Sequence, residues 1–338
     1  MNPNELPPPA QLMNFIVGKW ISKPIYAAAE FGIADILAEG PKSIEEIAQV
    51  TKTHAPSLKR VMRALASVGI FSETENNQYE LTPMAECLKT GAMRSIALMF
   101  NSDWNEKAWT YFTDSIRTGE TPFERAHGMP ISGWLENNPQ AEKMLGEANA
   151  LKAANSHRAI VDVYDFSGIN TLTDVGGGFG VLMAEILSVN PFMKGIVAEL
   201  PLAVRTAKET IRAREIEDRC EAVECDFFKQ IPAGADAYLM SHILHDWKDE
   251  ECQVILKNCH DAMKPGSKLL IVEMIIPPGN EPSIVKLLDL EMFVITGGRE
   301  RTEDEFRYLL ESSGFELSRI ISTKEGICVI EGIRELET

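Results

Sequence analysis

Two kinds of residue that mark specialised proteins are scarce in this chain of 338 residues. The six cysteines form no Cys-x-x-Cys pair and show no zinc-site spacing, so we expect buried free thiols in a reducing compartment. Basic residues are outnumbered: Lys and Arg total 33 against 50 Asp and Glu, and the net charge is −17. Because nucleic-acid phosphates require Lys and Arg, we expect no nucleic-acid partner.

Long apolar runs are also missing, and no stretch approaches the length of a membrane span. The first residues, MNPNELPPPA, lack the charged and apolar parts of a signal peptide. We therefore expect no membrane partner and a cytoplasmic location. The content of 45% hydrophobic and 25% charged residues is that of an ordinary globular protein, and the length suggests about two domains.

The stretch 171–187, TLTDVGGGFGVLMAEIL, is the most informative part of the sequence. A short apolar run meets a glycine cluster that includes Gly176, Gly178 and Gly180, and a helix-forming segment follows. This order predicts a strand, a tight turn and a helix, the start of a nucleotide-type βαβ unit. Glycines permit the sharp turn and let a ligand approach the backbone. A purely structural glycine turn is the alternative.

The acids around this turn indicate its ligand. A dinucleotide fingerprint needs a third glycine at position 181, where this chain has Val181. Asp174 lies at the end of the strand, and Glu199 follows the apolar run 195–198, where a ribose-binding carboxylate belongs. Such acids favour a cationic ligand, and S-adenosylmethionine carries a sulfonium, an ammonium and no phosphate. A nicotinamide-dependent oxidoreductase is the alternative.

The rest of the C-terminal half alternates strands and helices, which predicts a parallel, doubly wound sheet. We expect helices over 202–214 and 249–263, strands over 221–225, 237–240 and 269–272, and two antiparallel closing strands within 316–332. The fold class is therefore α/β, with a Rossmann-like doubly wound sheet and an antiparallel last strand. Ligands of such sheets bind at the carboxyl ends of the strands.

The first ninety residues have the pattern of a winged helix. Ser43 and Glu46 form a predicted capping box at the start of one helix. Pro56 and Gly69 mark the start and end of a second helix, and Tyr79–Thr82 is typical of a short strand.

Two functions are compatible with this N-terminal domain. Lys59, Arg60 and Arg63 lie on the predicted recognition helix, where they would either contact DNA or form a solvated face. Apolar residues recur at helical spacing over 11–38, interrupted at Pro24, which predicts two helices or a kinked one. Their hydrophobic surface exceeds what a small domain covers alone, so we expect pairing with a second copy of the chain.

The middle of the chain is helical and rich in methionine and aromatic side chains. Most of these belong to an ordinary core, but some are suited to a pocket for a flat organic molecule. The predicted substrate-binding residues are Trp104, Met144, Asn149, Met292 and Phe293. The predicted domains are 1–90 for dimerisation, 91–165 as a helical linker that contributes to the substrate pocket, and 166–338 for cofactor binding and catalysis.

Three residues near strand ends point to acid–base chemistry. His245 follows the fourth strand, Glu273 ends the fifth, and Glu300 lies just before a helix. A carboxylate on one imidazole nitrogen fixes the tautomer and leaves the other nitrogen to take a proton. Surface ion pairs are the alternative for the glutamates. His242 and His245 together suggest a metal site, but no third ligand follows at a recognised spacing, so we expect no metal.

Several motifs together resemble those of one enzyme family: DVGGGFG, AELP, DFFKQIPAGADAYLMSHILHDWKDEEC, IVEMIIP and GGRERTEDEF. They are similar to the motifs of class I S-adenosylmethionine-dependent O-methyltransferases of the caffeic acid, acetylserotonin and bacterial polyketide type. The likeness covers nearly the whole chain. It implies a winged-helix dimerisation domain, a homodimer, and S-adenosyl-L-methionine as the cofactor, with S-adenosyl-L-homocysteine as product.

The resemblance implies that His245 is the catalytic base and that Glu273 and Glu300 flank it. The cofactor-binding residues are expected to be Asp174, Gly176, Gly178, Gly180, Glu199, Leu200, Asp226, Phe227, Ser241, His242, Asp246 and Trp247. Two departures stand out: the ribose acid is commonly aspartate, and Lys or Arg is common where Ser241 and His242 stand.

The energetics of proton removal favour an acidic acceptor. A phenol has a pKa near 10 and histidine about 6.5, a gap of about 3.5 units or roughly 5 kcal/mol. An aliphatic hydroxyl leaves about 9 units, or roughly 12 kcal/mol. We therefore expect His-assisted O-methylation of a phenolic hydroxyl on a small aromatic molecule. The alternatives are C-methylation, retention of the donor without methylation, and a winged-helix DNA-binding regulator.

Overall fold

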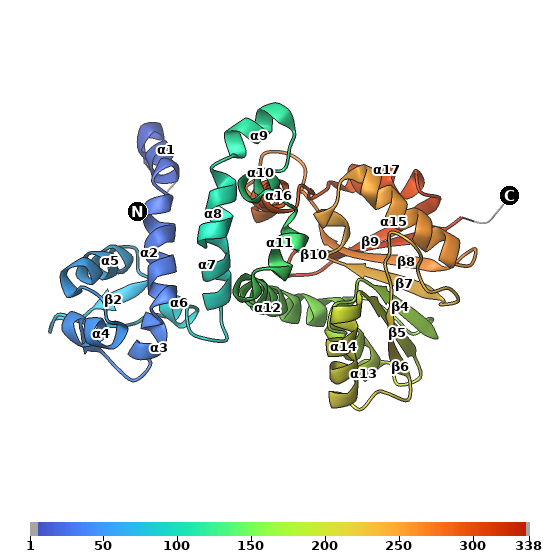
Figure 1. Cartoon of the computed structure of the whole chain (residues 1–338), viewed down its shortest axis with the longest axis horizontal. Helices are drawn as coiled ribbons and strands as arrows, with labels where there is room; N and C mark the ends of the chain where they lie inside the picture. Colours follow the sequence, from blue (N-terminus) through green and yellow to red (C-terminus); the bar gives the residue numbers. More distant parts are fainter. Residues whose placement is uncertain (1–5, 336–338) are drawn as a thin grey trace. The chain divides into compact units, whose positions relative to one another are not determined.

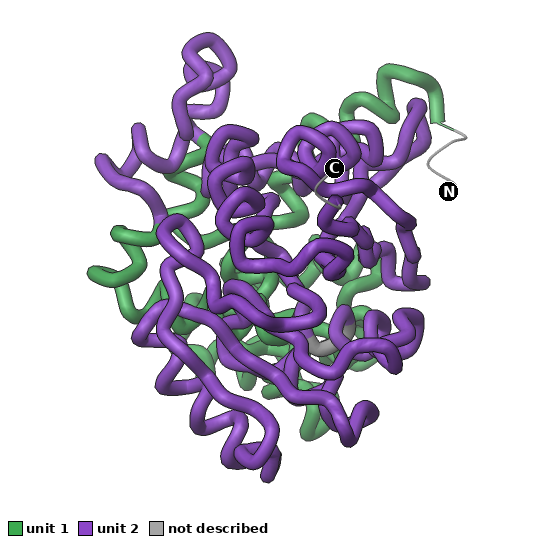
Figure 2. Tube along the Cα trace, turned by 90° about the vertical axis from the view of Figure 1, so that its right-hand side faces the viewer, with its two compact units in different colours: residues 1–109, 132–152 green, residues 110–131, 153–338 purple. Residues whose placement is uncertain are grey.

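The computed structural model describes residues 6–335, except for the side chains of residues 152, 154 and 155. The chain divides into two compact units, distinguished by colour in Figure 2: residues 1–109 with 132–152, and residues 110–131 with 153–338. The predicted linker is therefore divided between the units. Across residues 6–335, no helix is both long enough and apolar enough to cross a membrane.

The first unit contains the predicted winged-helix pattern (Figure 1). Its elements are α1 (Pro8–Ile16), α2 (Lys19–Glu30), α3 (Ile33–Leu37), β1 (Lys42–Ser43), α4 (Ile44–Thr51), α5 (Ala55–Ser67), β2 (Phe71–Glu73), β3 (Gln78–Leu81), α6 (Pro83–Glu86), α7 (Arg94–Phe100) and α8 (Asp103–Trp109). The capping box is confirmed, because Ser43 N donates to Glu46 Oε2 at 2.7 Å and Glu46 N donates to Ser43 Oγ at 3.3 Å. Strand β3 pairs antiparallel with β1 and β2.

The N-terminal helices differ from the expectation at Pro24. Helix α2 continues through Pro24, and the break between α1 and α2 falls at residues 17–18. These helices leave large apolar side chains in solvent, among them Phe15 with 82% and Trp20 with 72% of its surface exposed. Such an apolar surface is typical of an interface.

The second unit is built on a seven-stranded sheet in the order β6-β5-β4-β7-β8-β10-β9. The strands are β4 (Thr171–Val175), β5 (Lys194–Glu199), β6 (Cys220–Glu224), β7 (Ala237–Ser241), β8 (Lys268–Met274), β9 (Phe315–Ser322) and β10 (Ile327–Arg334). The first five are parallel, and β10 runs antiparallel to both β8 and β9. The predicted α/β, Rossmann-like class with an antiparallel last strand is confirmed.

Helices cover both faces of this sheet (Figure 1). The helical elements of the second unit are α9 (Phe112–Thr118), α10 (Pro122–His127), α13 (Val181–Val189), α14 (Pro201–Ala213), the 3₁₀ turn η2 (Leu244–Asp246), α15 (Asp249–Ala262), α16 (Ile284–Ile295) and α17 (Glu303–Glu311); α11 (Ile131–Glu136) and α12 (Pro139–Val163) are divided between the units. Successive strand residues enter opposite cores, as the pleat requires. Leu239 and Val272 join the core with α13 and α14, whereas Tyr238 and Ile271 join the core with α15 and α17.

Candidate active site

The turn after β4 bends through glycines that no other residue replaces without strain. Gly176, Gly178 and Gly180 have φ values of 71°, 54° and 74°. A Cβ on Gly176 would lie 2.5 Å from Cδ1 of Ile243, whereas the side of Gly178 faces open space. Gly180 is the N-cap of α13, so the turn directs the free N–H groups of that helix toward the carboxyl end of β4.

Asp174 is a buried acid beside this turn. Its surface is 1% exposed, and its Oδ1 finds no hydrogen-bond partner among the described residues. Burial, assisted by the nearby Glu199 carboxylate, raises the pKa of Asp174 to about 7. An isolated buried carboxylate is costly, and a cation supplies the partner that it lacks. The cationic ammonium and sulfonium groups of S-adenosylmethionine therefore fit these carboxylates.

Glu199 connects the end of β5 to the glycine turn. Its Oε2 accepts from Gly178 N at 3.1 Å, and its Oε1 accepts from Leu200 N at 2.7 Å. Each carboxylate oxygen retains a second lone pair, which suits a ribose hydroxyl. The longer glutamate arm thus reaches the turn despite the departure from aspartate. Leu200 is 54% exposed, and its cofactor role stays a prediction.

Aromatic rings gather after β6. Asp226 is held locally, because its Oδ1 accepts from Phe228 N at 3.1 Å and its Oδ2 lies 2.8 Å from Lys229 Nζ. The ring of Phe228 lies 5.0 Å from that of Phe227 and 4.7 Å from that of Trp247, measured between centroids. Flat apolar faces of this kind suit an adenine ring. Phe228 was not among the predicted residues, although the adjacent phenylalanine pair signalled it.

Three further predicted cofactor residues lie at the end of β7 or in the segment that follows it, through η2. Ser241 has a buried Oγ for which the described part of the chain provides no partner. His242 has a φ of 56°, an unusual backbone conformation for a residue other than glycine, and its Nδ1 lies 4.0 Å from Glu273 Oε2. Asp246 Oδ1 lies 3.9 Å from Nε2 of His245. Strained backbone of this type clusters at functional sites.

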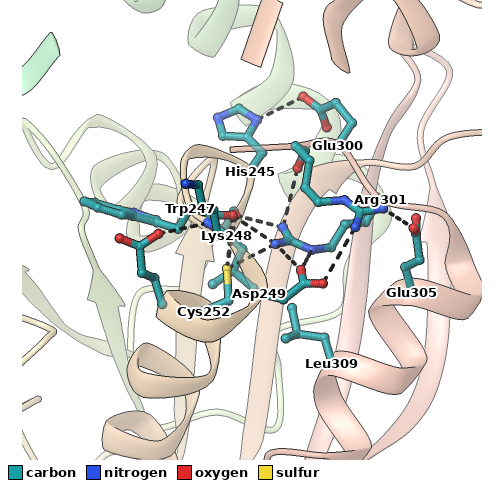
Figure 3. Close-up of polar contacts among 12 residues, drawn as sticks. His245, Trp247, Lys248, Asp249, Cys252, Glu300, Arg301, Glu305 and Leu309 are labelled. Atoms are coloured by element: carbon teal, nitrogen blue, oxygen red, sulfur yellow. Dashed lines mark hydrogen bonds and ion pairs between the residues drawn. The ribbon is translucent and has the colours of Figure 1, made fainter. Parts of the chain in front are cut away.

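Three segments meet around the imidazole of His245. His245 lies in η2, Glu273 in β8 and Glu300 just before α17. The Nδ1 of His245 lies 3.1 Å from Glu300 Oε1 and 3.3 Å from Glu273 Oε2. Figure 3 marks the contact between His245 and Glu300 with a dashed line. The two carboxylates are 1% and 0% exposed. Because carboxylates only accept, Nδ1 carries a proton and Nε2 is the nitrogen available for chemistry.

The charges of this cluster alter its titration. Burial of the ring lowers the pKa of His245, but Glu273, Asp246 and Glu300 outweigh it and raise the pKa to about 10. Burial raises the pKa of Glu273 to about 7, although His245 opposes the change. The carboxylates therefore favour the protonated form of the imidazole. The carboxylates thus hold the pKa of His245 above the ordinary histidine value of about 6.5 that was used for the comparison with a phenol.

The same corner of the sheet contains a set of potential metal ligands. His242, His245 and Glu273 each offer one ligand atom, and these atoms lie within 4.8 Å of one another. The spacing of the two histidines did not reveal the third ligand, because Glu273 comes from the neighbouring strand. The absence of a metal stays a prediction.

The predicted substrate-binding residues belong to both units. Trp104, Met144 and Asn149 lie in the first unit, and Met292 and Phe293 lie half-buried on α16 in the second. The Phe293 ring lies 6.2 Å from that of Phe112, between centroids. The substrate role of all five stays a prediction.

Two polar residues that organise the cluster were not predicted. Asp289 of α16 accepts from Glu300 N at 2.8 Å, which fixes the loop that carries Glu300. Arg301 is 1% exposed and contacts the turn that carries His245. The run GGRERTEDEF draws attention to its charges, but the backbone partners of Arg301 leave no trace in a sequence.

The Rossmann-like sheet, the glycine turn between two acids and the buried histidine–glutamate cluster define a methyltransferase of the S-adenosylmethionine-dependent class. The family model for the O-methyltransferase domain matches residues 109–316, and the model for the O-methyltransferase dimerisation domain matches residues 13–91. The chain therefore belongs to the O-methyltransferase family and is an S-adenosylmethionine-dependent enzyme of that family.

Similar proteins cover the chain almost from end to end. Phenazine O-methyltransferase PhzM of Lysobacter antibioticus is 41% identical over 95% of this chain and 94% of its own length. Mitomycin biosynthesis 6-O-methyltransferase of Streptomyces lavendulae is 34% identical over 95% and 93%. Human N-acetylserotonin methyltransferase, solved in complex with S-adenosylmethionine, superposes with a TM-score of 0.86 at 25% identity over 98% of this chain and 99% of the other.

Proposed function

We propose that this enzyme methylates a phenolic hydroxyl of a small aromatic molecule, with His245 as the general base. One observation carries the proposal: Nδ1 of His245 lies between two buried carboxylates, Glu273 and Glu300. This arrangement orients the ring and assigns Nε2 as the proton acceptor. Relatives whose names specify a phenazine, a mitomycin and N-acetylserotonin support an aromatic acceptor.

The proton and the methyl group move in opposite directions in the proposed step. Nε2 of neutral His245 takes the hydroxyl proton as the acceptor oxygen bonds to the methyl carbon, and Glu273 and Glu300 stabilise the resulting imidazolium. S-adenosyl-L-methionine, when bound, supplies the methyl group and leaves as S-adenosyl-L-homocysteine with the electron pair of the broken carbon–sulfur bond. Asp174, Glu199 and the Phe227 ring would hold its cationic, ribose and adenine parts.

The raised pKa of His245 lowers the cost of removing a proton from a phenol. At about 10, the pKa of the imidazolium matches that of a phenol, about 10, so proton transfer from a phenol to the neutral ring is close to thermoneutral. For an aliphatic hydroxyl, the pKa difference from the imidazolium is still about 6 units, or roughly 8 kcal/mol. The raised pKa lowers the cost of proton removal from both acceptors by the same amount, so a phenol stays favoured over an aliphatic hydroxyl by the margin it has with an unperturbed histidine.

Replacement of His245 by glutamine tests this proposal. His245→Gln removes the base and keeps much of the side-chain volume, so turnover should fall on the order of 10²- to 10⁴-fold. S-adenosylmethionine affinity, measured by calorimetry, should stay unchanged. Products are identified by mass spectrometry with labelled donor and a panel of phenols, with aliphatic alcohols as matched acceptors.

A second histidine provides the control. His260 lies on α15, and its replacement by glutamine should leave turnover as in the wild type. Wild-type turnover in His245→Gln would exclude the base assignment.

We further propose that the enzyme is a homodimer in the cytoplasm and uses neither a metal nor nucleic acid. The dimerisation-domain match and the exposed apolar side chains of α1 support the dimer. The cysteines, all free, suit a reducing compartment. Loss of turnover on treatment with EDTA would contradict the metal-free site. A gel shift with salt-sensitive DNA binding, abolished by Arg63→Glu on α5, would contradict the absence of a nucleic-acid partner.

A further inference from the structure

Arg301 is the largest side chain that is almost fully buried in the described part of the chain, with 1% of its surface exposed. A buried guanidinium is tolerated only when its donors are satisfied. Its Nε and Nη2 donate to Asp249 Oδ1 at 3.0 and 2.7 Å, and Nη2 lies 3.3 Å from Cys252 Sγ. The Asp249 side chain is 45% exposed, so this ion pair alone does not require the arginine to be buried.

The remaining donors bind both ends of residues 244–247, here named the His245 turn (Figure 3). Nη1 of Arg301 donates to the carbonyl of Leu244 at 2.8 Å, and Nη2 donates to the carbonyl of Trp247 at 3.0 Å. These two carbonyls lie on either side of His245 in the chain. A planar guanidinium with several donors spans both of them, whereas an ammonium offers a single point of contact.

The residues just before Arg301 contact the same turn. Arg299 N donates to the carbonyl of His245 at 2.9 Å, and Glu300 Oε1 accepts from the imidazole at 3.1 Å. A Cβ on Gly298 would overlap the backbone of the turn, so the two segments touch directly there. Residues 298–301 thus hold the backbone of the His245 turn, both of its ends and the imidazole ring.

We propose that Arg301 is a positioning residue for methyl transfer, which fixes the turn so that the His245 ring keeps its place between Glu273 and Glu300. The proposal rests on the function proposed above for His245. Among the described residues, the Arg301 guanidinium donates no hydrogen bond to the imidazole or to the carboxylates of Glu273 and Glu300; it acts through the carbonyls of the turn. Misplacement of a catalytic group by about 1 Å lowers a rate on the order of 10²-fold.

The conservative variant Arg301→Lys tests the proposal in the full-length protein. Lysine keeps the charge near Asp249 but cannot span both carbonyls, so the turn should loosen and kcat should fall on the order of 10²-fold. The dissociation constant of S-adenosylmethionine should change little. The imidazole should move away from its carboxylates, so its pKa, followed by NMR titration and assigned with His245→Gln, should fall toward the ordinary histidine value.

Arg319→Lys is the matched control. Arg319 pairs with Glu331, a carboxylate that is 4% exposed, but contacts no residue of the His245 turn among the contacts of the second unit. The Arg319→Lys variant should have a lower melting temperature than the wild type and unchanged values of kcat and of the imidazole pKa. Asp249→Asn, which loosens Arg301 without removing it, gives the same readouts if Arg301→Lys does not fold.

The outcomes separate the two proposals. A folded Arg301→Lys protein with wild-type kcat and imidazole pKa and a lower melting temperature would show a merely structural arginine and overturn the inference. A shifted imidazole pKa combined with full turnover in His245→Gln would support Arg301 as the support of the turn and overturn the base assignment instead.

Discussion

The protonation state of the His245 imidazole decides whether the ring can act as a base, because only the neutral ring can accept a proton. The anionic neighbours that orient the ring also stabilise its cationic form, so orientation and readiness oppose each other. Burial lowers the pKa of His245. The carboxylates of Glu273, Asp246 and Glu300 raise it, and the net value is about 10. The raised pKa therefore lowers the fraction of neutral base at neutral pH, and this fraction rises as the pH rises.

The pH profile of turnover tests this balance. Because the neutral ring is the base and the raised pKa delays its formation, kcat/KM should rise about tenfold per pH unit from pH 7 to 9. An ordinary histidine would reach a plateau just above about pH 6.5. Glu300→Gln removes one anion, so it should move the rising limb to lower pH.

Acceptor ionisation is the competing explanation of such a rise. Phenols of different acidity should give the same rising limb if the limb belongs to His245, and limbs that follow the acceptor pKa would contradict the assignment. A wild-type plateau below pH 7 with every acceptor would contradict the raised pKa of the base.

Asp174 provides a second prediction at this scale, on cofactor affinity. Burial and Glu199 raise the pKa of Asp174 to about 7, and the ionised form attracts a cation, so affinity for S-adenosylmethionine should increase from pH 6 to 8. Asp174→Asn should abolish this increase and weaken binding on the order of 10- to 100-fold, the loss expected for one charged hydrogen bond. Calorimetry measures both effects.

A neutral ligand is the control for Asp174. 5′-Methylthioadenosine carries neither the ammonium nor the sulfonium, so its affinity should be the same at pH 6 and pH 8 and in Asp174→Asn. An S-adenosylmethionine affinity that is equally flat across this range would show that Asp174 does not face the cation.

Loops at neighbouring strand ends carry the proposed chemistry at the scale of elements. The turn after β7 carries His245, β8 carries Glu273, and the loop before α17 carries Glu300. Direct backbone contact between the first and last of these, at Gly298, sets their separation. A Cβ on Gly298 would overlap the carbonyl oxygen of His245 and lie 2.7 Å from Trp247 N, and neither backbone atom can rotate away.

Gly298→Ala should therefore displace the turn and lower kcat on the order of 10²-fold, with unchanged affinity for S-adenosylmethionine. Steady-state kinetics and calorimetry measure the two quantities. Gly168→Ala is the matched control, because a Cβ there meets nothing within 4 Å. Equal kcat values in Gly298→Ala and the wild type would show that this contact does not set the position of the base.

The sequence predicted the elements well because their signals are local. Short apolar runs in alternation with helical segments predicted the strands of the sheet, and the glycine cluster with Asp174 and Glu199 predicted the turn at its carboxyl edge. Other features depend on strand order, which no local pattern contains. Glu273 approaches His242 because β7 and β8 are neighbours, and the partners of Arg301 are backbone carbonyls.

At the scale of the whole molecule, the N-terminal helices expose several large apolar side chains. Leu12, Phe15, Ile16 and Trp20 are 59%, 82%, 65% and 72% exposed, all within α1 and the start of α2. Burying a side chain of this size contributes roughly 1.5–3 kcal/mol. In a symmetric dimer each contact occurs twice, so one substitution acts on two copies.

Phe15→Glu should therefore raise the dimer dissociation constant on the order of 10²-fold or more, since about 1.4 kcal/mol corresponds to a factor of ten. Sedimentation velocity over a range of concentrations measures the change, and circular dichroism establishes that the variant stays folded. Phe192→Glu is the control: Phe192 is 96% exposed but lies after α13 in the second unit, so this variant should sediment as the wild type does. A Phe15→Glu protein that remains dimeric at wild-type concentrations would place the interface elsewhere on the chain.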